Sequence, residues 1–349
     1  MNIVVDSDDL VRDLTARIAA AVARWAPGAT VLEVAPLTGG SSSLTYTARI
    51  SGAPAGHEQV VLKVAPPGLP PVRNRDVLRQ ARLMRAVEGN PGVQVPRVLF
   101  EDAGDPPGVP PFVAMSFVPG QCVEPVLVPR GTLSPEHVRA RAFDAARMLA
   151  ALHRIDPRRT PLVDEPVVSL ADEIDRWTRA FETVPDDLRE GYEVVADRLH
   201  ATMPPPMEPV LNHGDYRLGN ILCEGDRVRA IIDWEIWSLG DPRVDVTWFT
   251  FFTDEARHPA SLSDEPTGMP TKAELVAAYE EARGVRLTDL AWFEALTKYK
   301  ESAATALLIK RARKAGSLRG VHQRMLPALA VLRQEALELI DGRPPRSHW

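Results

Sequence analysis

One stretch of the chain, residues 211–235, holds the side-chain types that magnesium-assisted phosphoryl transfer requires. Asp215 is followed five positions later by Asn220, and His213 precedes both, which gives the spacing H-x-D-x-x-x-x-N. In kinase catalytic loops with this spacing, the aspartate accepts a proton from the attacking hydroxyl and the asparagine binds a metal ion. The sequence therefore predicts Asp215 as a catalytic residue and Asn220 as a metal ligand.

A second acidic side chain follows directly after a buried run. Residues 228–232 have the composition of a strand, and Asp233 comes next. A short hairpin would bring the Asp233 carboxylate back towards Asn220. Carboxylate and amide oxygens are ligands that Mg²⁺ prefers, so Asp233 is predicted as the second metal ligand.

Four residues in or near this motif receive supporting roles. His213 is expected to brace the loop through hydrogen bonds rather than to act as a base. Arg217 has two open interpretations: it offsets charge on the transferring phosphate, or it forms an ion pair with a nearby carboxylate. Asp241 and Asp245, in the segment GDPRVDV, are expected to tie the following helix to the metal-binding loop.

The first half of the chain offers groups for a nucleotide. Lys63 lies in the β-branched run VVLKVA, where its ammonium is expected to contact the α- and β-phosphates. The preceding turn has glycines that permit close backbone approach and serines that offer hydroxyls and amides. The turn residues assigned to nucleotide binding are Gly39, Gly40, Ser41, Ser42 and Ser43. Met115, Phe117 and Val118, near the end of another run, are expected to contact adenine.

The elements needed to position these groups change along the chain from strands to helices. Short strands are predicted at 31–34, 44–50, 60–64, 95–101 and 112–118, with one main helix at 73–87 and an amphipathic helix before the first strand. After Pro119 and Gly120, helices are predicted from a Ser134 cap to Leu152, at 290–312 and at 328–340. The predicted class is α+β, with an N-terminal antiparallel-sheet lobe and a larger, mostly helical C-terminal lobe.

Length and composition fit two lobes, divided here into residues 1–118 for nucleotide binding and 119–349 for catalysis and substrate binding. The net charge of −6 argues against a nucleic-acid partner, and no apolar run is long enough to span a membrane. Cys122 and Cys223 are too few and too separated for a disulfide framework, which fits a reducing cytoplasm. A monomer or a homodimer is expected.

Taken together, these segments resemble the aminoglycoside phosphotransferase family of small-molecule kinases, including its branch related to kinase domains attached to acyl-CoA dehydrogenases. The resemblance runs from LTGGSSSLTY through VVLKVA, PFVAMSFVPG and LHRID to HGDYRLGN, IIDWE and GDPRVDV. It implies a bilobal protein-kinase-like fold that uses ATP and Mg²⁺. On this basis Asp215 is the catalytic aspartate, Asn220 and Asp233 bind metal, and Lys63 contacts phosphate.

One position departs from that family pattern. A glutamate on the N-lobe helix usually pairs with the strand lysine, whereas this chain has Gln80 there. Glutamine supplies no charge to Lys63, although Asp76, one turn earlier, is a possible substitute. The departure keeps open a nucleotide-binding regulatory protein with weak or no kinase activity. Nucleotidyl transfer on the same scaffold is a further alternative.

The acceptor is expected to be a small molecule with a hydroxyl group. An aminoglycoside would need clustered carboxylates, and candidates are Asp164, Glu165, Asp172, Glu173, Asp175, Glu182, Asp186 and Asp187. Five tryptophans could instead cage a choline-like cation or line an acyl pocket, namely Trp177, Trp234, Trp237, Trp248 and Trp292. Solvated helix faces more often explain such carboxylates, and core or rim packing more often explains such tryptophans. Neither set therefore selects the acceptor, and aminoglycosides, choline-like amines and hydroxyacyl-CoAs all remain candidates.

Overall fold

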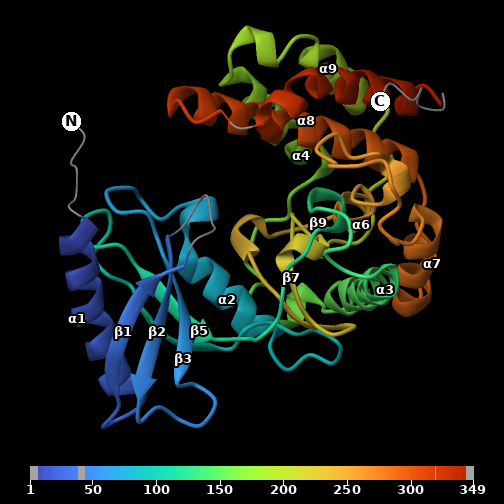
Figure 1. Ribbon diagram of the computed structural model, residues 1–349. Helices are drawn as coiled ribbons and strands as arrows, with labels where there is room; N and C mark the ends of the chain where they lie inside the picture. Colours follow the sequence, from blue (N-terminus) through green and yellow to red (C-terminus); the bar gives the residue numbers. More distant parts are fainter. Residues whose placement is uncertain (1–6, 38–43, 319, 343–349) are drawn as a thin grey trace. The chain divides into compact units, whose positions relative to one another are not determined.

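The computed structural model describes residues 7–37, 44–318 and 320–342, and the chain divides into two compact units. The first unit comprises residues 1–120, 160–162 and 229–236, and the second comprises the remainder. Figure 1 shows the elements of both. The structure confirms the α+β class, with an antiparallel sheet in the N-terminal unit and a mostly helical C-terminal unit. The division between residues 118 and 119 stays a prediction.

The first unit is built on a five-stranded antiparallel sheet with the order β1-β2-β3-β5-β4. Its strands are β1 (Thr30–Pro36), β2 (Leu44–Ser51), β3 (Gln59–Val64), β4 (Val98–Asp102) and β5 (Phe112–Ser116). Helix α1 (Ser7–Trp25) packs its Leu14, Ile18 and Val22 against the apolar face of this sheet. Alternation along β3 places Val60, Leu62 and Val64 in that core and therefore directs Lys63 to the opposite face.

Helix α2 (Val77–Val87) begins four residues later than predicted. The Asp76 side chain accepts a hydrogen bond from the Arg79 amide, which makes it the N-cap, while Arg73–Arg75 form a separate 3₁₀ turn. Strand β4 also begins later than predicted, after Pro96, which has no N–H to donate to a sheet. Strand β5 ends at Ser116, so Phe117 and Val118 lie beyond it.

The second unit contains seven α-helices within the described ranges. They are α3 (Pro135–Leu152), α4 (Leu170–Glu182), α5 (Tyr192–Ala201), α6 (Arg243–Thr250), α7 (Lys272–Arg283), α8 (Leu290–Lys314) and α9 (Gly320–Ile340). The predicted Ser134 cap is confirmed, since its hydroxyl accepts a hydrogen bond from the His137 amide. Helix α9 begins two turns before the predicted Ala328 because the helix continues through Pro327 instead of starting after it.

Helix α8 is buried on several sides, and this determines which side chains reach the interior of the unit. It packs against α4, α5, α6 and α9 around a core that includes Phe181, Phe293 and Tyr299. Lys298, Lys300 and Glu301 of this helix are consequently buried. Within the described ranges, no helix combines the length and apolarity that crossing a membrane requires.

Two short antiparallel pairs frame the segment with the H-x-D motif. Strand β6 (Val210–Asn212) pairs with β9 (Ser238–Gly240), and β7 (Ile221–Glu224) pairs with β8 (Arg227–Ile231). The loop at 213–220 therefore starts from one pair and ends in the other, with a 3₁₀ turn at Leu218–Asn220. Both ends of the loop are fixed by backbone hydrogen bonding.

Candidate active site

The Asp215 carboxylate is held from two sides. Its Oδ1 accepts a 2.7 Å hydrogen bond from Trp248 Nε1 and a 3.3 Å bond from Arg217 Nε. Its Oδ2 accepts a 2.7 Å bond from Asn220 Nδ2, which also donates to the Asp215 carbonyl at 2.9 Å. About a quarter of the Asp215 side chain remains exposed. The carboxylate is thus fixed in orientation and still accessible to a reactant.

The backbone before Asp215 is anchored by Asp245. The amides of His213 and Gly214 donate to the two oxygens of this buried carboxylate at 2.5 and 2.8 Å. The fully buried His213 ring accepts a hydrogen bond from the Asp215 amide through Nδ1. His213 therefore braces the loop, as predicted, and Asp245 ties helix α6 to it.

His153, at the end of α3, stands behind Asp245. Its Nε2 lies 3.5 Å from Asp245 Oδ2, too long for a strong hydrogen bond, and its Nδ1 is 2.7 Å from the Tyr279 hydroxyl. Burial lowers the pKa of His153, which keeps the ring neutral. Burial alone would raise the pKa of Asp245, but the interaction with His153 and the hydrogen bond from the His213 amide hold that pKa below its ordinary value. Asp245 therefore stays ionised, as its two amide donors require.

Lys300 supports the same loop from helix α8. Its ammonium donates to the Gly214 carbonyl and lies over two indole rings, 3.8 Å from the Trp248 centroid and 5.7 Å from that of Trp177. Burial lowers the pKa of this lysine, although the charges of carboxylates around it, Asp215 and Asp245 among them, oppose the shift. Lys300 thus contacts both the backbone next to Asp215 and the indole that holds its carboxylate.

Glu124 fixes the far end of the loop. Its Oε2 accepts a hydrogen bond from the Gly219 amide at 3.0 Å and lies 3.8 Å from Arg217 Nη1. Burial raises the pKa of Glu124 to about 7, against the opposing effects of Arg217 and the Gly219 amide. The Arg217 guanidinium also lies over the Phe252 ring, with its carbon 5.6 Å from the centroid. The ion-pair interpretation of Arg217 is therefore realised with both Asp215 and Glu124.

A second buried carboxyl, Glu301, lies next along helix α8. Burial raises its pKa to about 7, and the charge of Asp215 acts in the same direction. Its Oε1 accepts a hydrogen bond from the Thr305 hydroxyl at 2.9 Å and lies 3.9 Å from His258 Nε2. Burial lowers the pKa of His258 to about 3, so this imidazole is neutral and packs on the Phe252 ring.

In the first unit, Lys63 and Asp233 contact each other directly. Lys63 Nζ lies 2.6 Å from Asp233 Oδ1, and the two side chains are 15% and 35% exposed. Asp233 follows strand β8 with a left-handed backbone (φ 66°), a conformation that aspartate tolerates better than most residues and that occurs often at functional sites. The two residues predicted to bind phosphate and metal therefore form one ion pair.

The other residues predicted to bind the nucleotide lie on β5, after β5, or outside the described residues. Met115 pairs with Val61 across β5 and β3, and Lys63 pairs with Val113, so Met115 shares the sheet face of Lys63. Phe117 is exposed and Val118 half-buried, both past the end of β5. Gly39, Gly40, Ser41, Ser42 and Ser43 lie outside the described residues.

Among the described residues, no side chain of α2 forms a hydrogen bond or ion pair with Lys63. Gln80 is buried and its amide donates to the Asn74 carbonyl at 3.5 Å. The Asp76 carboxylate caps α2, so it does not substitute for a glutamate at Lys63. Asp233 is the carboxylate that balances this lysine.

Most of the acidic residues considered for an aminoglycoside are already engaged. Asp172 closes a capping box with Ser169, and Glu173 accepts a hydrogen bond from the Trp177 indole. The remaining engaged members form ion pairs, which are Asp175 with His200, Asp186 with Arg189, and Asp187 with Arg313. The five tryptophans considered for a ligand cage are all buried.

Sequence reasoning missed four contributors to this site: Trp248 as a partner of Asp215, Lys300 and Glu124 as supports of the loop, and Glu301 as a nearby buried carboxyl. None belongs to a local motif. The first three contact the loop through tertiary packing, and Glu301 interacts with Asp215 through its charge. The one available signal was the presence of charged residues at helical spacing inside the apolar pattern of 290–312. Charges at such positions indicate a buried polar cluster.

A family model described as "Phosphotransferase enzyme family" matches residues 33–296 of this chain. The match includes the loop at 213–220, its anchor Asp245 and the Lys63–Asp233 pair. The chain belongs to this phosphotransferase family.

Curated relatives contain a similar segment within much longer proteins. Human acyl-CoA dehydrogenase family member 11 is 24% identical over 280 residues, which are 77% of this chain and 35% of that protein. Mouse acyl-CoA dehydrogenase family member 10 is 27% identical over 223 residues, covering 62% and 20% of the two chains. The chain thus spans about a third or less of the length of these relatives.

Solved structures show the same fold. A putative aminoglycoside phosphotransferase of Ralstonia eutropha matches with a TM-score of 0.72 at 22% identity, covering 96% of this chain and 99% of that one. An ADP-bound aminoglycoside phosphotransferase APH(2'')-Ib matches with a TM-score of 0.56 at 18% identity, with coverage of 96% and 99%. The predicted kinase-like fold is confirmed by these matches.

Proposed function

We propose that this protein transfers the γ-phosphoryl group of ATP to a hydroxyl of a small molecule, with Mg²⁺, in the cytoplasm and as a monomer or homodimer. The observation that carries the proposal is the Asp215 carboxylate, oriented by Trp248 on one oxygen and by Asn220 on the other. Membership of a phosphotransferase family supports this chemistry.

In the proposed reaction, Asp215 accepts the proton of the acceptor hydroxyl while the hydroxyl oxygen attacks the γ-phosphorus. The bond from the γ-phosphorus to the β–γ bridging oxygen breaks, and ADP leaves. The carboxylate is suited to this role because its hydrogen bonds fix its direction before the acceptor arrives. Arg217, next to Asp215, is proposed to reduce the repulsion between the carboxylate and the phosphate.

Asn220 and Asp233 are the proposed magnesium ligands. Asn220 uses its amide nitrogen on Asp215, which leaves its Oδ1 as the atom for a metal, and Asp233 offers carboxylate oxygen. Both are hard oxygen donors of the kind Mg²⁺ selects, and the ion would neutralise phosphate charge. Lys63 is proposed to contact the α- and β-phosphates, Gly39 to Ser43 to cover them, and Met115, Phe117 and Val118 to contact the adenine.

Most of the carboxylates considered for amine recognition are already engaged in helix caps, hydrogen bonds and ion pairs. Fewer of them are therefore available to the ammonium groups of an aminoglycoside than the sequence suggests. Near Asp215 the cations Arg217 and Lys300 lie among the carboxylates of Glu124 and Asp245, so the local charge does not select a class of acceptor.

A choline-like acceptor is disfavoured by a separate observation. The indoles of Trp248 and Trp177 do surround a cation, but that cation is the ammonium of Lys300. Of the acceptor classes considered, hydroxyacyl-CoAs are the class against which neither of these two observations counts.

A second candidate function is nucleotide binding with weak or no transfer. It is favoured by Gln80, which bonds to the Asn74 carbonyl and leaves Lys63 without a charged partner from α2. Among the described residues, Asp233 is the carboxylate paired with Lys63, and the lysine is less firmly positioned once Asp233 binds metal.

The test is a screen for acceptor-dependent ADP formation. The purified protein would be incubated with Mg·ATP and panels of aminoglycosides, amino alcohols and hydroxyacyl-CoAs, with direct binding of Mg·ATP measured in parallel. Acceptor-dependent turnover that disappears in Asp215→Asn supports the kinase. Mg·ATP binding with no turnover on any panel supports the second candidate, and absence of binding removes both.

A further inference from the structure

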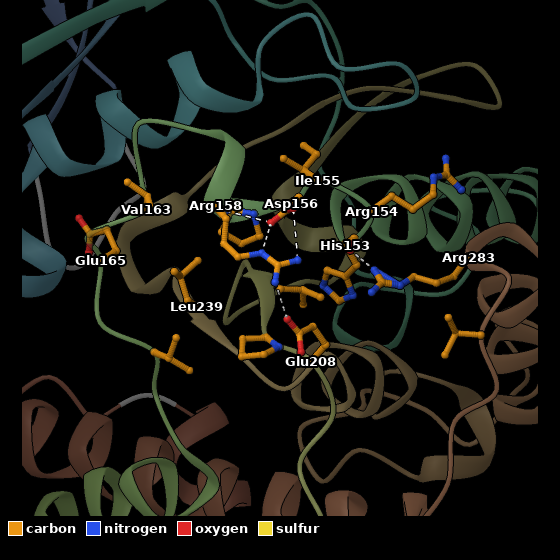
Figure 2. Close-up of a pocket in the computed structure, with 15 residues that line it drawn as sticks. His153, Arg154, Ile155, Asp156, Arg158, Val163, Glu165, Glu208, Leu239 and Arg283 are labelled. Carbon is orange, nitrogen blue, oxygen red and sulfur yellow. Dashed lines mark hydrogen bonds and ion pairs between the residues drawn. The ribbon is translucent and has the colours of Figure 1, made fainter.

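The helical unit has a hollow of about 440 Å³, here named the α3–α7 pocket. It is lined by the residues after α3 (153–158), the segment 163–167, the start of β6, Leu239 of β9 and the end of α7 (Figure 2). The Asp215 carboxylate and its direct partners are not among the lining residues. The pocket is therefore separate from the Asp215 carboxylate, although His153 belongs to its lining.

One part of its wall exposes apolar side chains to solvent. Val163 and Val167 are 54% and 52% exposed, and Val285 on the α7 side is 36% exposed. Leu239 and Pro209 continue this wall. Valines left half in water around a concave surface are typical of a site that takes the apolar part of a ligand.

The polar part of the lining contains a guanidinium with unused donors. Arg283 is partly buried and donates through Nη1 to the His153 carbonyl, at the C-terminal end of α3. Among the residues that the structure describes, no carboxylate forms an ion pair with Arg283 and no acceptor is bonded to its Nε or Nη2. Burial lowers the pKa of this guanidinium, and the neighbouring Arg154 acts in the same direction. An anion bound in the pocket would counter both burial and the charge of Arg154, because it would stabilise the charged guanidinium.

A second guanidinium is available nearby. Arg158 pairs with Asp156 at 2.9 Å and with Glu208 at 3.3 Å, but its side chain is 72% exposed. Exposed pairs of this kind are weak and readily exchange partners. Figure 2 shows Arg158 and Arg283 extending towards the middle of the view from different elements, whereas the guanidinium of Arg154 points away.

We propose that the α3–α7 pocket binds a small amphipathic anion, a carboxylate or phosphate ester with a short apolar group. The anionic head would bond to Arg283 and Arg158. The apolar group would cover the exposed valines of the lining, Val163, Val167 and Val285. One water molecule, which has one non-hydrogen atom, occupies about 30 Å³ in the liquid. On that scale the pocket volume of about 440 Å³ accommodates a ligand of roughly 10 to 15 non-hydrogen atoms.

This pocket touches the support of the catalytic loop. His153 lines it, receives the Arg283 hydrogen bond on its carbonyl, and places its ring against Asp245. Asp245 in turn holds the amides of His213 and Gly214. A ligand that engages Arg283 therefore acts on the residue behind the loop anchor.

Isothermal titration calorimetry would test the binding site with hexanoate, hexyl phosphate and inorganic phosphate. We expect saturable binding of one or both hexyl compounds, at least tenfold weaker binding of inorganic phosphate, and a tenfold or greater loss of affinity in Arg283→Met. Arg159→Met, an exposed neighbour outside the lining, is the matched control and retains parent affinity. Arg158→Met provides a second variant that weakens binding if Arg283→Met does not fold.

No saturable binding of either hexyl compound by the parent, or equal affinity in all folded variants, would overturn the proposal. Binding of Mg·ATP, measured in the same preparations, reports separately on the proposed kinase function. Hydrogen–deuterium exchange of the peptide containing His213 and Gly214 tests the link to the loop: we expect the bound hexyl compound to change the exchange rate of these amides in the parent. Unchanged exchange at saturation would overturn that link.

Discussion

The indole nitrogen of Trp248 donates a 2.7 Å hydrogen bond to Oδ1 of Asp215, and the same indole carries the Lys300 ammonium on its face, 3.8 Å from the ring centroid. One aromatic side chain thus links a buried cation to the carboxylate proposed as the base. The cation polarises the indole N–H, which strengthens the hydrogen bond to Asp215. Trp248 is in this sense a positioning residue, because it acts through Asp215.

Trp248→Phe removes that hydrogen bond while keeping an aromatic face for Lys300. We expect kcat to fall by about tenfold, because losing one bond to a charged group costs on the order of 1.5–3 kcal/mol and Asn220 still holds the other oxygen. The KM for ATP should stay within about twofold. Steady-state kinetics with an acceptor from the screen would measure both.

Trp292→Phe is the matched control for this substitution. Trp292 is equally buried and loses a comparable hydrogen bond, from its Nε1 to the Leu199 carbonyl at 3.2 Å, at a position that does not contact Asp215. Equal losses of kcat in both variants would show that the effect comes from core packing and not from positioning of the carboxylate.

Asp215→Asn tests the proton acceptor. The amide keeps the size of the side chain and loses its basicity, so we expect kcat to fall by about 10²–10⁴-fold with Mg·ATP binding retained. The control is Asp197→Asn, an exposed aspartate on α5. A variant with parent turnover would remove Asp215 from its proposed role.

Lys300→Met tests the buried support. The substitution leaves the Gly214 carbonyl without its ammonium donor and removes a desolvated cation–π contact. We expect the free energy of unfolding to decrease by about 2 kcal/mol, with a loss of kcat as the loop loosens. Urea denaturation followed by far-ultraviolet circular dichroism would measure the change.

Lys310→Met serves as the control for Lys300→Met. Lys310 lies on the same helix and also donates to a backbone carbonyl, that of Thr183, but this hydrogen bond is exposed to solvent. We expect its substitution to change the free energy of unfolding by less than about 0.5 kcal/mol. If Lys310→Met were as destabilising as Lys300→Met, the aromatic surroundings of Lys300 would not explain its contribution.

Glu301 predicts a pH dependence of stability. Its pKa rises from an ordinary value of 4.5 to about 7, so between these values the folded state binds more protons than the unfolded state. Stability therefore falls as the pH rises through this window, by at most about 3 kcal/mol for the 2.5-unit difference. Glu301→Gln never ionises, so it should be more stable than the parent at pH 8 and equal to it at pH 4.

Denaturation at both pH values, with Glu281→Gln as an exposed control on α7, would measure this difference. The control should follow the parent at each pH. A Glu301→Gln variant that is less stable than the parent at pH 8 would contradict the raised pKa.

The parts of the site predicted from sequence are those encoded locally. The relation of Asp215 to Asn220 lies within one loop, and the face of Lys63 follows from strand alternation. The contacts made by Trp248 and Lys300 join residues separated by 33 and 86 positions. Such contacts depend on how α6 and α8 pack, which no spacing in the sequence encodes.

Errors at element ends have similarly specific causes. The start of α2 depended on whether Asp76 or an earlier residue caps it, and either would have matched the pattern. Helix α9 was predicted from residue 328, directly after Pro327. The proline removes a helix hydrogen bond, and the packing of α9 on α8 outweighs that loss. The packing of helices against one another determined both the length of α9 and the burial of charged residues on α8.

The 2.6 Å contact between Lys63 and Asp233 has a consequence for nucleotide selectivity. With the proposed roles, binding separates this pair, after which the lysine needs an anion and the aspartate needs a cation. Free ATP supplies only the first and free Mg²⁺ only the second, so either alone leaves one partly buried charge unbalanced. Mg·ATP supplies both, so with the proposed roles the ion pair would make nucleotide and metal binding positively cooperative.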